Sequence, residues 1–168
     1  MAFDSKEQRR IMGKFATGVT VASTVVGDET WGMTANAVTS LSLDPPLVIL
    51  CVQKDSQSYD KFKDAGCFAL SILSAEQQEI SDRFAFKGPK DFSGLETATA
   101  MTGAPILRGA LGWVDCKLSE VVPGGDHDIF IGEIVAGEAV DDDDSASNDS
   151  ESGQPLLYFG GKYAELGG

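Results

Sequence analysis

The chain has 168 residues, which suits one domain spanning residues 1–168 and is enough to bury a core without disulfides or a structural metal. Hydrophobic residues make up 42% and charged residues 23%, a composition that excludes disorder as the main state. Thirteen basic residues against 26 acidic ones give a net charge of −13, which argues against a nucleic-acid partner bound by phosphate neutralisation.

Signals for membrane insertion, export and zinc binding are missing from the sequence. No apolar run approaches the roughly 20 residues of a membrane span, and the N-terminus lacks the apolar segment of a signal peptide. The three cysteines, Cys51, Cys67 and Cys116, are widely spaced, and with one histidine, His127, they are too few for a Cys/His zinc site. We therefore expect buried, reduced thiols in a cytoplasmic protein that has no membrane partner and binds no metal.

The first third of the chain predicts one helix followed by strands. Residues 5–15 carry a capping-box pattern at Ser5 and Gln8, and the short helix that they predict is expected to cover one end of a barrel. The apolar period then changes from that of a helix to two, which is typical of strands. The strands predicted in this way span residues 19–25, 30–35, 37–43 and 47–52. The last of them is apolar throughout, so we expect it to be buried on both faces.

The remainder predicts two more helices among longer strands. One helix begins at residue 55 or 56 and ends at Gly66. A second capping box, formed by Ser74 and Gln77, opens the other helix. The remaining strands are predicted at residues 67–73, 110–122, 128–140 and 155–159.

Two segments interrupt this pattern. Residues 87–105 form a long excursion rich in small and polar residues, of a kind that is often functional in a compact domain. Residues 141–153, DDDDSASNDSESG, contain no core-forming residue and predict a solvated acidic loop. About seven strands joined by short turns favour an antiparallel barrel over a doubly wound sheet.

Familiar nucleotide motifs are absent, and three polar features remain as candidate sites. No GxGxxG motif follows the first strand and no P-loop occurs, so neither a Rossmann site nor a Walker site is supported. The first feature is a polar cluster within otherwise apolar strands, for which ordinary alternation of buried and solvent-facing residues is the competing explanation. Its members are Thr34, Asn36, Thr39, Ser40 and Ser42.

The second feature is the passage from a strand into a helix at residues 51–58, and the third is the single histidine. A helix start carrying Lys54, Ser56 and Ser58 offers N–H groups and a positive dipole end to a phosphate. Plain N-capping by Ser56 is the alternative, but it leaves the other two residues without a role. His127 lies at a glycine-rich turn, where a rigid sheet positions exposed side chains, although a lone histidine is more often structural.

Six segments, taken in chain order, resemble the flavin reductase-like domain family: FATGVTVAST (15–24), GMTANAVTSLSLDPPLVILCV (32–52), the S-x-S of Ser56 and Ser58, FALSIL (68–73), GAPIL (103–107) and GDH (125–127). The resemblance runs from Phe15 to about Tyr163, and the acidic loop 141–153 is longer than the family's usual turn. It implies a mainly β fold with short helices, the FMN-binding split barrel, built as a six-stranded antiparallel Greek-key barrel in a homodimer.

The resemblance also implies a function: an NAD(P)H:flavin oxidoreductase that passes a hydride from NADH or NADPH to FMN or FAD. Such proteins often supply reduced flavin to a partner flavin-dependent monooxygenase. A non-catalytic flavin-binding or storage protein and an electron-transfer flavoprotein of the same fold remain alternatives. Visible absorption of the purified protein and NAD(P)H consumption with added flavin distinguish them.

By the family pattern, each part of the flavin has its own residues in this sequence. Those expected along the isoalloxazine are Thr34, Ala35, Asn36 and Ser40, and those along its edge are Cys51, Val52 and Gln53. The phosphate is expected at Ser56 and Ser58, and the ribityl or adenine side at Phe84 and residues 87–92. His127 is the expected catalytic residue, lying near the nicotinamide and orienting it without transferring a proton in the hydride step.

Overall fold

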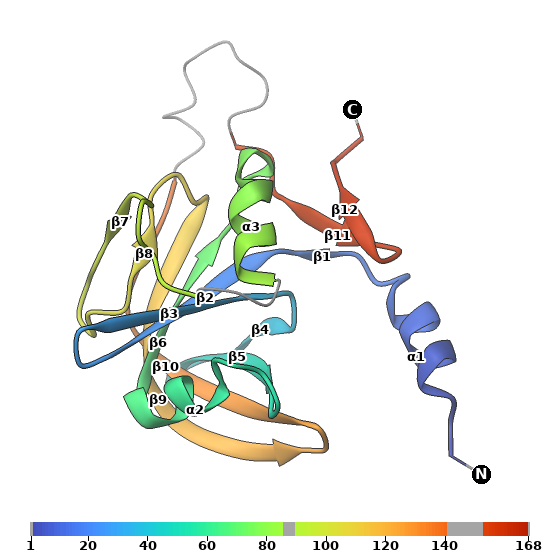
Figure 1. Cartoon of the computed structure of the whole chain (residues 1–168), viewed down its shortest axis with the longest axis horizontal. Helices are drawn as coiled ribbons and strands as arrows, with labels where there is room; N and C mark the ends of the chain where they lie inside the picture. The colour runs from blue at the N-terminus through green and yellow to red at the C-terminus, as the bar shows by residue number, and fades with distance from the viewer. Residues whose placement is uncertain (1, 86–89, 141–152, 168) are drawn as a thin grey trace.

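A seven-stranded antiparallel sheet that curls around an apolar core forms the body of the protein (Figure 1). The computed structural model describes residues 2–85, 90–140 and 153–167. The strand order is β3-β2-β6-β9-β10-β5-β4. These strands are β2 (Thr20–Val26), β3 (Glu29–Ala35), β4 (Val38–Leu43), β5 (Pro46–Gln53), β6 (Cys67–Ile72), β9 (Gly112–Gly124) and β10 (His127–Ala139).

Short helices and two small sheets surround this main sheet. The helices are α1 (Ser5–Met12), α2 (Tyr59–Ala65), the 3-10 turn η1 (Ala75–Gln77) and α3 (Gln78–Ala85). One small sheet has the order β1-β11-β12, and its strands are β1 (Thr17–Gly18), β11 (Leu157–Phe159) and β12 (Lys162–Ala164). The other small sheet pairs β7 (Thr97–Ala98) with β8 (Ile106–Leu107). No helix in the described parts of the chain is long and apolar enough to cross a membrane.

The mainly β fold with short helices is confirmed, but the expected number of six strands differs from the seven observed in the main sheet. The difference arises at the junction of β3 and β4. These strands follow each other in the chain, yet each pairs with a different neighbour: β3 with β2, and β4 with β5. They therefore form the two edges of the sheet. Asn36 and Ala37 connect one edge strand to the other.

The core explains why β5 is only partly buried, against the expectation that both of its faces are covered. Val48, Leu50 and Val52 point into a cluster that also contains Phe68 of β6 and Phe130 of β10. The alternate residues of β5, although equally apolar, are only half-buried. The apolar run therefore predicted the strand correctly, but it did not show that the second face of the strand is only half-covered by the rest of the chain.

Helix α1 differs from its prediction in both its cap and its place. Its N-cap is Asp4, whose carboxylate accepts a hydrogen bond from Lys6 N at 3.0 Å, so Ser5 is the first helical residue. All eight residues of α1 are described and none is buried. The helix stands beside the barrel and does not cover its end (Figure 1). By contrast, the predicted cap at Gly66 and the capping box of Ser74 are both present.

The segments on either side of the acidic loop are held by backbone hydrogen bonds. Val140 N donates to Leu111 O at 2.9 Å before the loop, and Ala75 N donates to Gln154 O at 2.8 Å after it. Residues 141–152, which make up nearly all of the predicted loop, lie outside the described residues.

A buried carboxylate fastens the predicted excursion to the main sheet. Asp115 on β9 is fully buried. Thr102 donates to it twice, from its backbone N at 2.8 Å and from its hydroxyl at 2.5 Å. The hydroxyl of Thr102 also accepts a hydrogen bond from Ala104 N at 3.2 Å. Residues 97–107 are thus ordered by a polar anchor as well as by apolar packing.

We predict that Asp115→Asn lowers the free energy of unfolding by about 1–3 kcal/mol, because an amide can accept only one of the two hydrogen bonds and turns an N–H group toward the other donor. Urea unfolding followed by circular dichroism measures this change. Asp64→Asn, an exposed acid on α2, is the matched control and is expected to unfold like the wild type. Equal stabilities of the two variants would contradict the anchoring role.

Candidate functional site

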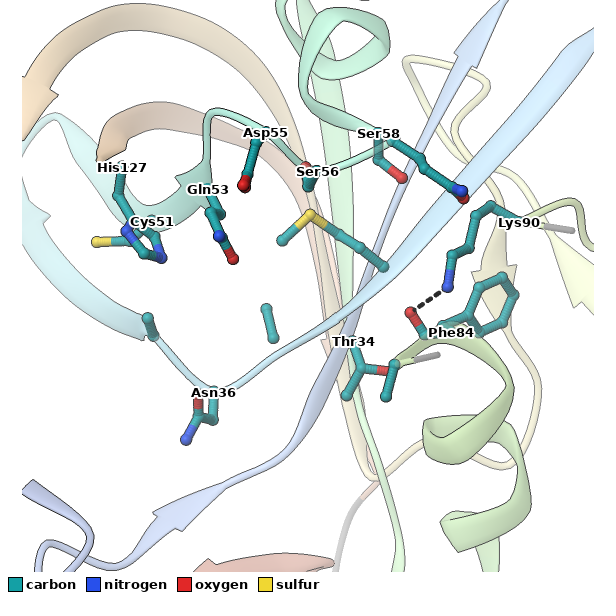
Figure 2. A pocket seen from close by; sticks show the side chains of 15 residues that line it. Thr34, Asn36, Cys51, Gln53, Asp55, Ser56, Ser58, Phe84, Lys90 and His127 are labelled. Carbon is teal, nitrogen blue, oxygen red and sulfur yellow. Dashed lines mark hydrogen bonds between the residues drawn. The ribbon is translucent and has the colours of Figure 1, made fainter. Parts of the chain in front are cut away.

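A cavity of about 430 Å³ lies where β3, β5, the start of β10 and α3 approach one another (Figure 2). Nine of the residues predicted for the site line it: Thr34, Ala35, Asn36, Cys51, Gln53, Ser56, Ser58, Phe84 and His127. Six further residues complete the lining: Met33, Ala37, Asp55, Gln57, Ala85 and Lys90. In Figure 2, His127 and Cys51 lie at one end of the cavity, and Ser58, Lys90 and Phe84 lie at the other.

Two predicted site residues lie elsewhere. Val52 is fully buried in the core, because strand alternation turns it away from the face that carries Cys51 and Gln53. Ser40 is exposed on the edge strand β4, opposite Val48 of β5, and is not among the residues that line the cavity. Of residues 87–92, only positions 90–92 are described, and positions 87–89 lie outside the described residues.

The loop between β5 and α2, residues 54–58, lines one side of the cavity and carries two serines. Helix α2 begins at Tyr59, and its N-cap Ser58 makes no side-chain capping bond. The hydroxyl of Ser58 instead donates to Gly32 O at 3.2 Å and ties the loop to β3. Ser56 lies before the helix, and its hydroxyl oxygen is buried without a hydrogen-bond partner among the described residues. Simple N-capping therefore does not explain Ser56.

The cationic group of the cavity is Lys90, and the sequence did not single it out. Lys90 is buried, its ammonium donates to Phe84 O at 2.9 Å, and burial lowers its pKa. Its backbone O accepts a hydrogen bond from Gly32 N at 2.9 Å, which fixes the residue against β3. Lys54, the lysine that the sequence did suggest, is directed toward the turn before β10 and is bonded there.

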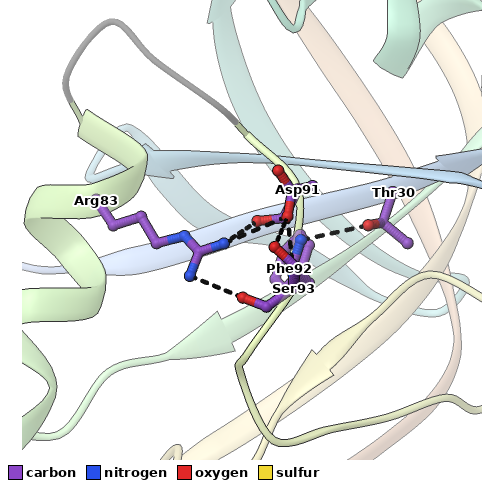
Figure 3. A network of polar contacts seen from close by, with 5 residues as sticks. All are labelled: Thr30, Arg83, Asp91, Phe92 and Ser93. Carbon is purple, nitrogen blue, oxygen red and sulfur yellow. Dashed lines mark hydrogen bonds and ion pairs between the residues drawn. The ribbon is translucent and has the colours of Figure 1, made fainter.

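A polar network on α3 holds the segment that carries Lys90 (Figure 3). Arg83 donates to Asp91 O at 2.7 Å and to Ser93 O at 3.0 Å, and its guanidinium lies 3.5 Å from the Asp91 carboxylate. Hydrogen bonds from Ser93 lower the pKa of that carboxyl. Phe92 follows Lys90 closely, and its ring packs on Phe84 with 4.7 Å between centroids. This wall of the cavity is therefore joined to α3 by charge and by aromatic packing.

A second set of hydrogen bonds joins the opposite side of α3 to β3 and to the C-terminal strands. Thr34 donates from its hydroxyl to Ser81 O at 2.6 Å. Tyr163 on β12 donates to Asp82 at 2.9 Å, and its hydroxyl lies 2.8 Å from the hydroxyl of Ser81. The hydroxyl of Thr34 thus positions α3 over the cavity, a role that alternation in a strand does not predict.

At the other end of the cavity, β10 pairs with β5 so that His127 lies opposite Gln53. The ring of His127 is partly exposed, and its Nδ1 lies 2.8 Å from Asp126 Oδ1. This contact is the main reason that the pKa of Asp126 is lowered. Burial raises the pKa of the Cys51 thiol, which keeps this side chain neutral at the cavity wall.

The arrangement favours binding over nucleophilic chemistry. Within the described part of the chain, the hydrogen bond of His127 goes to Asp126 and not to a serine or a cysteine, so it does not activate a nucleophile. The cavity offers a free hydroxyl, a buried ammonium, an imidazole and neutral walls in one elongated space. These groups suit a nucleotide that carries a phosphate and a planar ring.

Comparison with known proteins agrees with this geometry. The family model for the flavin reductase like domain matches residues 12–167. The chain belongs to this family. A curated relative in it is the reductase subunit of a flavin-dependent monooxygenase from Rhodococcus jostii, which is 33% identical over 165 residues. That alignment covers 98% of this chain and 80% of the relative.

Two further members of the flavin reductase family are informative. An NADH-dependent FAD reductase from Streptomyces globisporus is 40% identical over 137 residues, with 79% of this chain and 75% of the relative covered. A solved structure of the NADH:FAD oxidoreductase from Streptomyces globisporus, in complex with NAD and FAD fragments, superposes with a TM-score of 0.84 at 33% identity. That superposition covers 99% of this chain and 97% of the other.

Proposed function

We propose that the protein is an NADH:flavin oxidoreductase that binds its flavin in the 430 Å³ cavity. The observation that carries the proposal is the hydroxyl of Ser56, which is buried and has no hydrogen-bond partner among the described residues. Ser56 lines the same cavity as Lys90 and His127, in a chain of the flavin reductase family. A phosphate supplies the acceptor that the Ser56 hydroxyl lacks, and the Lys90 ammonium supplies positive charge. The residues present therefore fit a flavin nucleotide.

When bound together, the nicotinamide supplies a hydride and the flavin accepts it, so the protein need not supply a nucleophile. The residues of this chain bind and orient. Ser56 and Lys90 hold the phosphate end, while Met33 and Cys51 offer neutral surfaces to the ring. His127 positions the nicotinamide at the opposite end, and the rate gain comes from holding the two reactants at close approach.

Within this proposal we favour FAD over FMN and NADH over NADPH. A relative is named an NADH-dependent FAD reductase, and a similar solved structure contains NAD and FAD fragments.

A monooxygenase that uses the reduced flavin is the partner that we propose. The Rhodococcus jostii relative is named a reductase subunit of a flavin-dependent monooxygenase. Storage or electron transfer by a tightly bound flavin is the competing function. Steady-state assays with NADH and NADPH, each paired with FMN and FAD, distinguish these functions, because a storage protein binds flavin without oxidising the nicotinamide. Failure to consume NADH with either flavin would overturn the reductase function.

A homodimer is also part of the proposal. An apolar hollow of about 780 Å³ lies beside the flavin cavity and shares Asn36, Ala37 and Cys51 with it. The large apolar side chains that line it are Met12, Phe15, Val38, Ile49 and Ile72. Strand β4, at an edge of the main sheet, adjoins it, with Leu41 and Leu43 exposed. A second copy that covers this hollow buries these residues and closes one side of the cavity.

We predict that Ser56→Ala weakens flavin binding by about 1.5–3 kcal/mol, the value of a hydrogen bond to a charged group, without lowering the melting temperature. Ser58→Ala is the informative contrast: it removes the bond to Gly32 O and so lowers the melting temperature. Flavin dissociation constants from fluorescence titration and thermal melts measure both effects. Wild-type affinity in Ser56→Ala would exclude the phosphate contact.

We predict that His127→Ala lowers kcat for NADH oxidation roughly tenfold or more through lost orientation, with little change in flavin affinity. Ser119→Ala, an exposed residue on β9, is the control for handling and folding. If turnover is unchanged, His127 does not position the nicotinamide. A joint loss of melting temperature and flavin affinity would instead indicate a purely structural histidine.

We predict that Phe15→Asp shifts the protein from dimer to monomer at micromolar concentration, because it places a charge in the apolar hollow. Phe15 is 70% exposed in the single chain. Phe3 is a matched control, since it is 69% exposed but does not line the hollow. Sedimentation equilibrium measures the mass of Phe15→Asp, Phe3→Asp and wild type. A wild-type protein that is already a stable monomer would contradict the dimer.

A further inference from the structure

We propose that Asp128 is a positioning residue that holds the loop 54–58 and the turn carrying His127 in one fixed arrangement, so that both ends of the flavin and nicotinamide site depend on it. The proposal rests on the proposed function. Asp128 itself does not line the cavity, and it acts through Lys54 and Tyr59.

The carboxylate of Asp128 contacts both ends of the loop. Its Oδ2 accepts a hydrogen bond from the Tyr59 hydroxyl at 2.5 Å, at the residue where α2 begins. Its Oδ1 lies 3.2 Å from the ammonium of Lys54, at the residue where β5 has just ended. Ser56 lies between these two contacts. One side chain of β10 therefore fixes the start and the end of the loop that carries the candidate phosphate ligand.

Lys54 extends the same attachment to the turn before β10. Its ammonium donates to Gly125 O at 2.7 Å, and its backbone N donates to Asp126 O at 3.0 Å. The turn that ends at His127 is thus bonded to the loop by the side chain and by the backbone of one lysine. Movement of the loop without movement of the turn requires that these bonds break.

The burial of Asp128 gives this attachment its strength. Asp128 is 6% exposed, and a charge with so little water must be stabilised by partners. The Tyr59 hydroxyl and then Lys54 lower the pKa of its carboxyl, so the group is ionised at neutral pH, and Lys63 acts in the same direction. In return, Asp128 raises the pKa of Tyr59, whose ring packs edge-on against Phe130. The carboxylate is therefore integrated with the core and is not a loose surface pair.

The position of Asp128 in the chain separates this role from that of a cavity residue. His127 and Asp128 are neighbours on β10, and strand alternation places the histidine ring at the cavity and the carboxylate toward the loop and α2. A change at Asp128 reaches the reacting groups only through displacement of Ser56 at one end and His127 at the other. Displacement of either group weakens a function that depends on orientation.

The test is a pair of double-mutant cycles. We expect Asp128→Asn to raise the FAD dissociation constant and to lower kcat with NADH, each by roughly tenfold. In a Ser56→Ala background the effect of Asp128→Asn on FAD affinity should largely disappear, and in a His127→Ala background its effect on kcat should largely disappear. The same cycles with Asp64→Asn, the exposed acid on α2, should show no interaction.

Tyr59→Phe is the second variant, because it removes one hydroxyl and keeps the ring that packs on Phe130. It should raise the FAD dissociation constant more than it lowers kcat, since Tyr59 is attached to the loop and not to the turn. This difference between the effect on FAD affinity and the effect on kcat keeps the proposal testable if Asp128→Asn does not fold. A purely structural role lowers the melting temperature and leaves the cycles additive.

Additive cycles, or wild-type affinity and turnover in both variants, would overturn the positioning role. The wild-type assay separates this failure from failure of the proposed function. If the wild type binds FAD and oxidises NADH while the cycles are additive, only the role of Asp128 is lost. If the wild type does neither, the proposed function is lost, and with it the inference that rests on it.

Discussion

The site depends on the antiparallel pairing of β5 with β10. In this register His127 lies opposite Gln53, and six further residue pairs continue the alignment down to Leu47. The pairing places the glycine-rich turn before β10 beside the loop after β5, two segments about 70 residues apart in the sequence. A shift of one residue would turn His127 away from the cavity and move the apolar side chains of β5 out of the core.

Helix α3 supplies the other wall, and it is held by contacts on both of its sides. Arg83 binds the segment after residue 90, while Ser81 and Asp82 bind Tyr163 near the C-terminus. Several polar groups of the cavity wall are thus bonded to the protein itself, namely Thr34, Ser58 and Lys90. Ser56 is distinctive because its hydroxyl is buried and is not used in this framework.

Much of the fold was accessible from sequence, because β-branched alternation, capping boxes and glycine stops act locally. The strand at residues 19–25, the capping box of Ser74 and the helix end at Gly66 depend on neighbours in the chain. The place of α1 and the half-buried face of β5 depend on what surrounds them, and periodicity does not carry that information. The mainly β class could therefore be predicted, whereas the number of strands in the main sheet was not.

The same division applies to the site. Motif resemblance brought nine residues to one cavity, but it included Val52, whose side chain faces the core. It included Lys90 only as part of residues 87–92, without a role of its own. It did not identify Asp128, whose partners are a lysine and a tyrosine that are distant in sequence. Polar residues in apolar strands indicated where a binding site was to be expected. Only the tertiary contacts show which hydroxyls already donate a hydrogen bond to the protein.

The backbone bonds on either side of the acidic loop have a practical consequence. Val140 and Gln154 are each hydrogen-bonded to residues outside the loop. Neither bond requires a particular number of residues between the two positions. The entropy of closing a flexible loop grows only slowly with its length. This position is therefore a natural point for inserting a peptide tag, a fluorescent domain or a tether to an oxygenase.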